Sequence, residues 1–128
     1  MPLFKRKGRI KITRKQLLSL KPRRKEGIEW TQYEDGSTVI TYEHEPKGIG
    51  GKIISVLLAK PKKRKLILDE KGSFVWARLD GRNTLKDLIS LFSREFKISR
   101  RRAEVSIIEF LARLEERGLI EVEVPEPE

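Results

Sequence analysis

The chain has 128 residues, which suits a single domain, and 38% of them are hydrophobic, enough for a modest core. The net charge is +10 and there is no cysteine, which excludes disulfides, thiol catalysis and cysteine-ligated metals. The longest apolar stretch, 53–59, is too short to span a membrane, and no apolar segment follows the basic N-terminus as in a signal peptide, so we expect a cytoplasmic protein.

The charge is unevenly distributed along the chain. Residues 1–25 hold eleven Lys and Arg and no acid, residues 26–46 hold six acids and no base, and residues 47–65 hold seven bases and no acid. The remainder is nearly neutral. We therefore expect a basic N-terminal arm over residues 1–27, separate from the domain that follows.

The first elements are short. Ile10 and Ile12 alternate with basic residues, which favours a strand edge, and Thr13 begins a short helix that ends before Pro22. Residues 28–43 predict a β-hairpin, with a two-residue turn at Asp35-Gly36.

Residues 45–63 look like an insertion before a third strand. Within it, 52–60 fits either a strand or one face of a helix, and we favour a short helix. The third strand is predicted over 64–68, with Leu66 and Leu68 on one face and Ile67 on the other.

Three helices follow, and each has a readable start or end. Asp69 caps the first, which stops before Asp80-Gly81; Asn83 or Thr84 caps the second; Ser99 caps the third, which ends at Gly118. Apolar residues at helical spacing predict the core positions, which are Val75, Trp76, Leu79, Leu85, Leu88, Ile89, Phe92 and Phe96. The prediction is a small winged helix-turn-helix-like α+β domain over 28–124, a three-stranded antiparallel sheet followed by three helices, with a tail at 125–128.

The third helix has two apolar stripes. One is the core face, with Ala103, Ile107, Phe110, Leu111 and Leu114, and the other carries Val105, Ile108 and Ala112 with Arg101 in line one turn earlier. The second stripe is either covered by another part of the same chain or lines a groove beside the third strand. In the second case an extended peptide adds to the strand edge, and Arg101 or Lys65 pairs with a peptide carboxylate.

A family resemblance favours the groove. The residues Leu68-Asp69-Glu70, Gly72, Phe74 and Trp76, then Asp80-Gly81, Thr84-Leu85, Asp87-Leu88-Ile89 and a long helix ending Arg117-Gly118-Leu119-Ile120 resemble the PqqD family, named for coenzyme PQQ synthesis protein D. Members bind the leader segment of a precursor peptide as an added strand between the third strand and the third helix, and present it to a radical S-adenosylmethionine enzyme.

The resemblance implies a non-enzymatic peptide-binding module that needs no cofactor, with a precursor peptide and a modifying enzyme as partners. Carried over by position, the binding residues are Leu66, Ile67 and Leu68 at the edge, and Arg101, Val105, Ile108 and Ala112 as groove wall, with Lys65 nearby. The arm at 1–27 and the insertion at 45–63 depart from the family pattern, so the pathway stays open. The arm itself fills the groove in one alternative, and an exposed strand edge also permits a homodimer.

The alternative function is a winged-helix nucleic-acid-binding protein. Arg100, Arg101 and Arg102 begin the third helix, and the arm is strongly basic, although the same helix carries four glutamates. Peripheral membrane contact through 47–65 has less support, because its apolar part is short. His44 is the only histidine, and no acid–base or metal-binding motif indicates catalysis.

Overall fold

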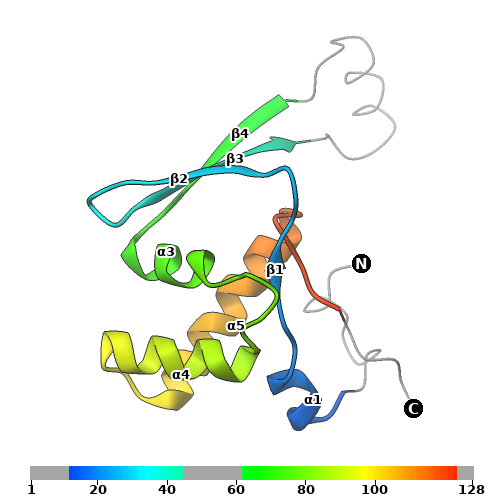
Figure 1. The fold of residues 1–128 in the computed structure, drawn as a ribbon, viewed down its shortest axis with the longest axis vertical. Helices are drawn as coiled ribbons and strands as arrows, with labels where there is room; N and C mark the ends of the chain where they lie inside the picture. Colours follow the sequence, from blue (N-terminus) through cyan, green and yellow to red (C-terminus); the bar gives the residue numbers. More distant parts are fainter. Residues whose placement is uncertain (1–11, 45–61, 124–128) are drawn as a thin grey trace.

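The structure is a computed structural model that describes residues 12–44 and 62–123 (Figure 1). An antiparallel sheet of three strands has the order β2-β3-β4. Its strands are β2 (Glu29–Gln32), β3 (Thr38–His44) and β4 (Lys62–Leu68); the four helices of the described residues are α1 (Arg14–Leu18), α3 (Glu70–Ala77), α4 (Leu85–Phe96) and α5 (Arg100–Glu116). A second, two-stranded sheet joins β1 (Arg23–Arg24) to β5 (Ile120–Glu121). The predicted α+β class is confirmed.

Side-chain caps determine where the helices begin, as the sequence predicted. Asp69 accepts a hydrogen bond from the Gly72 amide at the start of α3, and Ser99 accepts one from the Arg102 amide at the start of α5. Thr84, one of the two predicted candidates, caps α4 in a reciprocal capping box with Asp87. Thr13 caps α1 in the same way with Gln16.

The hairpin connection differs from the predicted two-residue turn at Asp35-Gly36. Gln32 pairs with Thr38 and the Tyr33 amide donates to the Ser37 carbonyl at 2.8 Å, so three residues form the loop. The Gly36 amide donates back to the Tyr33 carbonyl at 3.0 Å, and Gly36 has a φ of 90°. A turn followed by a left-handed residue is the usual geometry of a three-residue hairpin loop, and Gly36 supplies that left-handed residue.

The strand β4 alternates as predicted. Leu68 is 6% exposed and Leu66 packs partly buried against the core, whereas Ile67 is 70% exposed on the opposite face. Leu66 pairs with Ile40 of β3, and Ile40 in turn pairs with Trp30 of β2. The face that carries Leu66 and Leu68 therefore covers the helices.

The core lies between that sheet face and α3, α4 and α5. All of the predicted core residues from α3 and α4 are buried except Phe96, which is partly exposed beside Phe74 at a ring-centroid distance of 5.4 Å. On α5, Ala103, Ile107, Leu111 and Leu114 are buried and Phe110 is partly exposed.

The segment before the hairpin packs on the helices as well. Leu20 is buried, and its carbonyl accepts the Leu85 amide at 2.7 Å at the start of α4. The strand β1 connects this segment to β5, where Arg23 pairs with Glu121. The predicted division of the chain at residue 27 stays a prediction.

Three predictions lie outside the described residues. They are the strand edge at Ile10, whose partner position Ile12 is described and lies in no strand, together with its possible place in the groove; the short helix at 52–60 within the 45–63 insertion; and the tail at 125–128.

Candidate functional site

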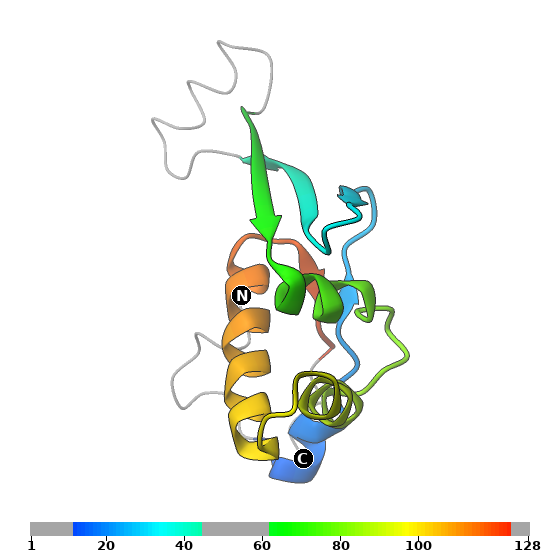
Figure 2. The same ribbon diagram turned by 90° about the vertical axis from the view of Figure 1, so that its left-hand side faces the viewer.

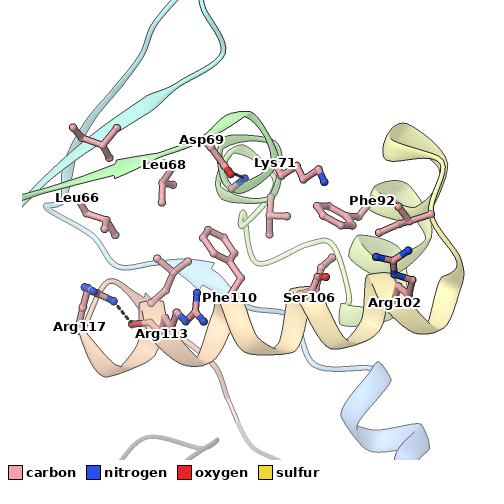
Figure 3. A pocket seen from close by; sticks show the side chains of 16 residues that line it. Leu66, Leu68, Asp69, Lys71, Phe92, Arg102, Ser106, Phe110, Arg113 and Arg117 are labelled. Carbon is pink, nitrogen blue, oxygen red and sulfur yellow. Dashed lines mark hydrogen bonds between the residues drawn. The ribbon is translucent and has the colours of Figure 1, made fainter.

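A groove of about 510 Å³ lies between β4, α3 and the length of α5 (Figure 3). Sixteen residues line it, namely Leu66, Ile67, Leu68, Asp69, Lys71, Gly72, Val75, Phe92, Ile98, Arg102, Ser106, Ile107, Phe110, Arg113, Leu114 and Arg117. A volume of this size is typical of binding pockets and accommodates several side chains of a ligand.

One side of β4 borders this groove without a neighbouring strand. Among the described residues β4 pairs with β3 alone, from Thr38↔Leu68 to His44↔Lys62. Figure 2 shows β4 and α5 on the same side of the molecule, with α3 beside them. The main-chain groups along that edge of β4 are therefore available for another strand.

The apolar part of the groove depends on close packing between α3 and α5. A Cβ atom on Gly72 would lie 3.3 Å from Cε1 of Phe110 and 3.3 Å from the Leu68 Cβ, tighter than ordinary contacts. Gly72 thus lets the Phe110 ring approach α3. Val75, which is 2% exposed, and Leu68 line the same region.

The polar part of the groove is mostly cationic. It is lined by Lys71 of α3, by Arg102 and Arg113 of α5, and by Arg117, the residue that follows α5 as its C-cap. The acidic residue of the lining is Asp69, and its Oδ1 atom accepts the Gly72 amide at 2.8 Å as the helix cap. An excess of positive charge favours an anionic ligand here.

The β4 half of the predicted site lies where the sequence analysis expected it. Leu66, Ile67 and Leu68 all line the groove, and Lys65 precedes them as an exposed residue opposite Thr41. Figure 3 shows that the labelled residues of β4 and of α5 point toward one shared space.

The α5 half of the predicted wall differs from the observed lining. Arg101, Val105, Ile108 and Ala112 are not among the described residues that line the groove. Each step along a helix turns about 100°, so the stripe of Val105 faces away from the side of Ser106 and Phe110. Ile108 packs against the core and Val105 is 48% exposed. Whether these four residues bind a peptide stays a prediction.

Arg14 of α1 approaches α5 near that stripe. Its Nη2 atom lies 2.8 Å from Oε1 of Glu104, whose side chain is 13% exposed. Part of the same chain therefore contacts Glu104, the residue before Val105, and whether the chain covers the stripe itself stays a prediction.

The groove side of α5 was not predicted from the sequence, because that side is mostly polar. Arg102, Ser106 and Arg113 give no apolar signal, and Phe110 was assigned to the core stripe. The available signal was the position of Phe110 at the margin of that stripe, one turn from Ser106 and Arg113.

The described residues form a small α+β domain in which a long helix and a strand edge that no other described strand pairs with border a shared groove. The chain belongs to the PqqD family: the model of coenzyme PQQ synthesis protein D matches residues 55–120, just over half of the chain. No curated protein and no solved structure matches it significantly. The matched region includes β4 and all three helices that surround the groove.

In the part of the chain that the structure describes, no helix is long and apolar enough to cross a membrane. No group of three or more His, Asp or Glu side chains there is arranged to hold a metal ion.

Proposed function

We propose that this protein is a non-enzymatic peptide-binding module with a winged-helix-like arrangement, which captures a precursor peptide and presents it to a modifying enzyme such as a radical S-adenosylmethionine maturase. The observation that carries the proposal is the edge of β4 beside the groove, which pairs with no strand of the described residues. An extended peptide at that edge gains main-chain hydrogen bonds from β4, and the groove takes alternate side chains.

Membership of the PqqD family supports both partners, because the resemblance implies a leader peptide and a maturase. Leu66, Ile67 and Leu68 would supply the edge, with Lys65 at its start. On α5, Ser106 and Phe110 are the wall residues that we propose in addition to the sequence-predicted stripe.

The test is a pull-down from native-source lysate after nuclease treatment, with captured peptides identified by mass spectrometry. The blocking variant is Ser106→Tyr, because Ser106 is exposed and a helical side chain extends over the preceding turn, here into the groove. The matched control is Glu109→Tyr, since Glu109 is an exposed residue of the same helix that belongs neither to the groove lining nor to the stripe of Val105. We expect a short peptide that Ser106→Tyr loses and Glu109→Tyr keeps.

Hydrogen exchange then locates the captured peptide. Addition of a strand should slow exchange of amides along β4, because main-chain bonds protect them from solvent. Equal recovery by all variants, or unchanged exchange in β4, would contradict the proposal. Nucleic acid recovered without nuclease treatment, and equally by Ser106→Tyr, would favour the nucleic-acid alternative.

The same experiment decides the role of the second stripe. The double variant Val105→Asp with Ile108→Asp is expected to lose the peptide without unfolding if the stripe binds it. If the double variant unfolds instead, as the contact of Ile108 with the core would explain, these residues are structural.

A further inference from the structure

The side chains of β4 determine which side chains are favourable on a peptide strand that pairs beside it. In a strand successive side chains alternate between faces, and neighbours across a pair of strands lie on the same face, about 5 Å apart. Leu66 and Leu68 point to the groove, whereas Lys63, Lys65 and Ile67 lie on the outer face and are exposed. A peptide paired with this part of β4 therefore meets the apolar Leu66 and Leu68 at alternate residues, with the exposed Arg64 next on the same face, and meets Lys63, Lys65 and Ile67 at the residues between.

The inward positions of such a peptide meet an apolar floor. Leu68 and Val75 are almost fully buried beneath it, and the ring of Phe110 packs against Gly72 at its side. An unpaired charge buried there would lose its hydration, so aliphatic or aromatic side chains fit these positions.

Cations surround this floor on the helix side as well. Two exposed arginines of α5 line the groove (Figure 3). Arg102 lies near the N-terminal end of the helix and Arg113 near its C-terminal end. Arg117 lies over the last turn, with Nη1 3.5 Å from the Arg113 carbonyl oxygen. Together with Lys63 and Lys65 they place positive charge on both sides of the peptide path.

We propose that the ligand of this groove is a peptide in which apolar residues alternate with Asp or Glu, the carboxylates facing Lys63 and Lys65. The inference rests on the proposed peptide-binding function and adds the class of peptide. A second copy of this chain fits the edge poorly, because an antiparallel β4–β4 pair brings lysines and arginines of one copy beside those of the other.

The test uses four labelled synthetic peptides and fluorescence anisotropy at low salt. The acidic peptide alternates leucine with glutamate after a soluble glycine–serine tail; the neutral and basic peptides replace glutamate by glutamine or lysine; the fourth is a scrambled isomer of the acidic one. We expect the acidic peptide to bind at least about tenfold more tightly than the neutral and scrambled peptides, and the basic peptide not to bind.

Two matched double variants separate local from general charge effects. Lys63→Gln with Lys65→Gln removes two charges from the outer face of β4, and Lys25→Gln with Lys86→Gln removes two exposed charges outside the groove lining. The first should reduce the preference for acidic over neutral peptide several-fold, and the second should leave it unchanged. Equal effects of the two variants would overturn the proposal.

The remaining outcomes distinguish this proposal from the proposed function. If neutral and acidic peptides bind equally and both are lost in Ser106→Tyr, the groove binds peptides but the acidic preference is wrong. Acidic peptide that binds Ser106→Tyr as tightly as the unmodified protein also overturns the proposal. If no synthetic peptide binds, the acidic class is wrong, and recovery of a peptide from lysate still decides the proposed function separately.

Discussion

Arg24 connects β1, the hairpin and α3 through one guanidinium group. Its Nη1 atom donates to the Trp76 carbonyl at 2.7 Å, at the C-terminal end of α3, and its Cζ atom lies 5.1 Å from the centre of the Trp30 ring. Trp30 in turn meets the buried Trp76 ring edge-on, at a centroid distance of 6.1 Å. We expect Arg24→Ala to lower the free energy of unfolding by about 1–2 kcal/mol, through the lost charge-assisted hydrogen bond and the lost cation–π contact.

Urea unfolding followed by tryptophan fluorescence measures this loss. The control is the neighbouring Arg23→Ala, because Arg23 pairs with Glu121 at 2.8 Å but both side chains are about half exposed. A pair so open to solvent contributes little to stability, so Arg23→Ala should lower the free energy of unfolding less than Arg24→Ala does. Equal losses in the two variants would show that Arg24 contributes only as a surface charge.

Asp80 makes the stability of the fold depend on pH. The carboxylate accepts the amides of Asn83 and Arg82 at 3.0 and 2.8 Å, and these bonds, the Asn83 bond first, lower the pKa of Asp80 below its ordinary value. The hydrogen bonds from Thr84 lower the pKa of Asp87 in the same way. A carboxyl with a lowered pKa in the folded state stabilises the fold above its unfolded pKa of about 3.9, and the stabilisation is lost as the pH falls through the folded pKa.

We therefore expect Tm to fall between about pH 5 and about pH 2, and Asp80→Asn to reduce that fall. Asparagine retains an oxygen that accepts the two amides but carries no titrating charge. Thermal unfolding by circular dichroism across this range is the measurement. An identical pH profile in the variant would mean that Asp80 does not contribute to the linkage.

At the scale of elements, the sequence predicted what depends on local chemistry. The capping residues Asp69, Thr84 and Ser99 start their helices by bonds to amides three residues later, so short sequence patterns contain that information. The predicted hairpin loop was one residue too short, because Asp35-Gly36 is compatible with two loop lengths and strand pairing selects between them. Which residues of α5 line the groove depends on how the helix is rotated about its own axis against β4. That rotation is a tertiary property, and the local sequence does not show whether Val105 or Ser106 faces the groove.

The C-terminal end of α4 offers a stabilising substitution. Lys97 caps the helix with φ 51° and ψ 48°, a left-handed conformation, and its amide donates to the Ser93 carbonyl. A residue with a Cβ atom is strained there, and glycine is not, although glycine loses more freedom on folding. We expect Lys97→Gly to raise the free energy of unfolding by about 0.5 kcal/mol, measured by urea unfolding.

The control is Lys86→Gly, at an exposed position of the same helix, which should lower the free energy of unfolding by about 1 kcal/mol. A loss of stability in Lys97→Gly would show that the side chain itself supports the cap.

At the scale of the molecule, the two edges of the main sheet carry opposite charge. The basic β4 edge borders the groove, whereas β2 and its loop carry exposed Glu29, Glu34 and Asp35. The arrangement favours an acidic strand at β4 and disfavours one at β2. Charge therefore helps to decide which of the two edges a peptide occupies, in addition to the shape of the groove.

The basic N-terminal arm adds positive charge to the chain. Residues 1–11 contain five bases and no acid, namely Lys5, Arg6, Lys7, Arg9 and Lys11. Replacement of all five by Gln keeps the length of the chain and lowers the net positive charge by half. If the arm attracts an acidic peptide over a distance, the affinity of this variant for the alternating leucine–glutamate peptide should depend less on salt, since screening removes such attraction.

The comparison is Lys63→Gln with Lys65→Gln. This double variant should weaken binding at both low and high salt, because closely paired charges are screened less. Anisotropy titrations from about 0.02 to about 0.5 M NaCl separate the two cases, and an unchanged salt dependence in the arm variant would limit the electrostatic recognition to the groove.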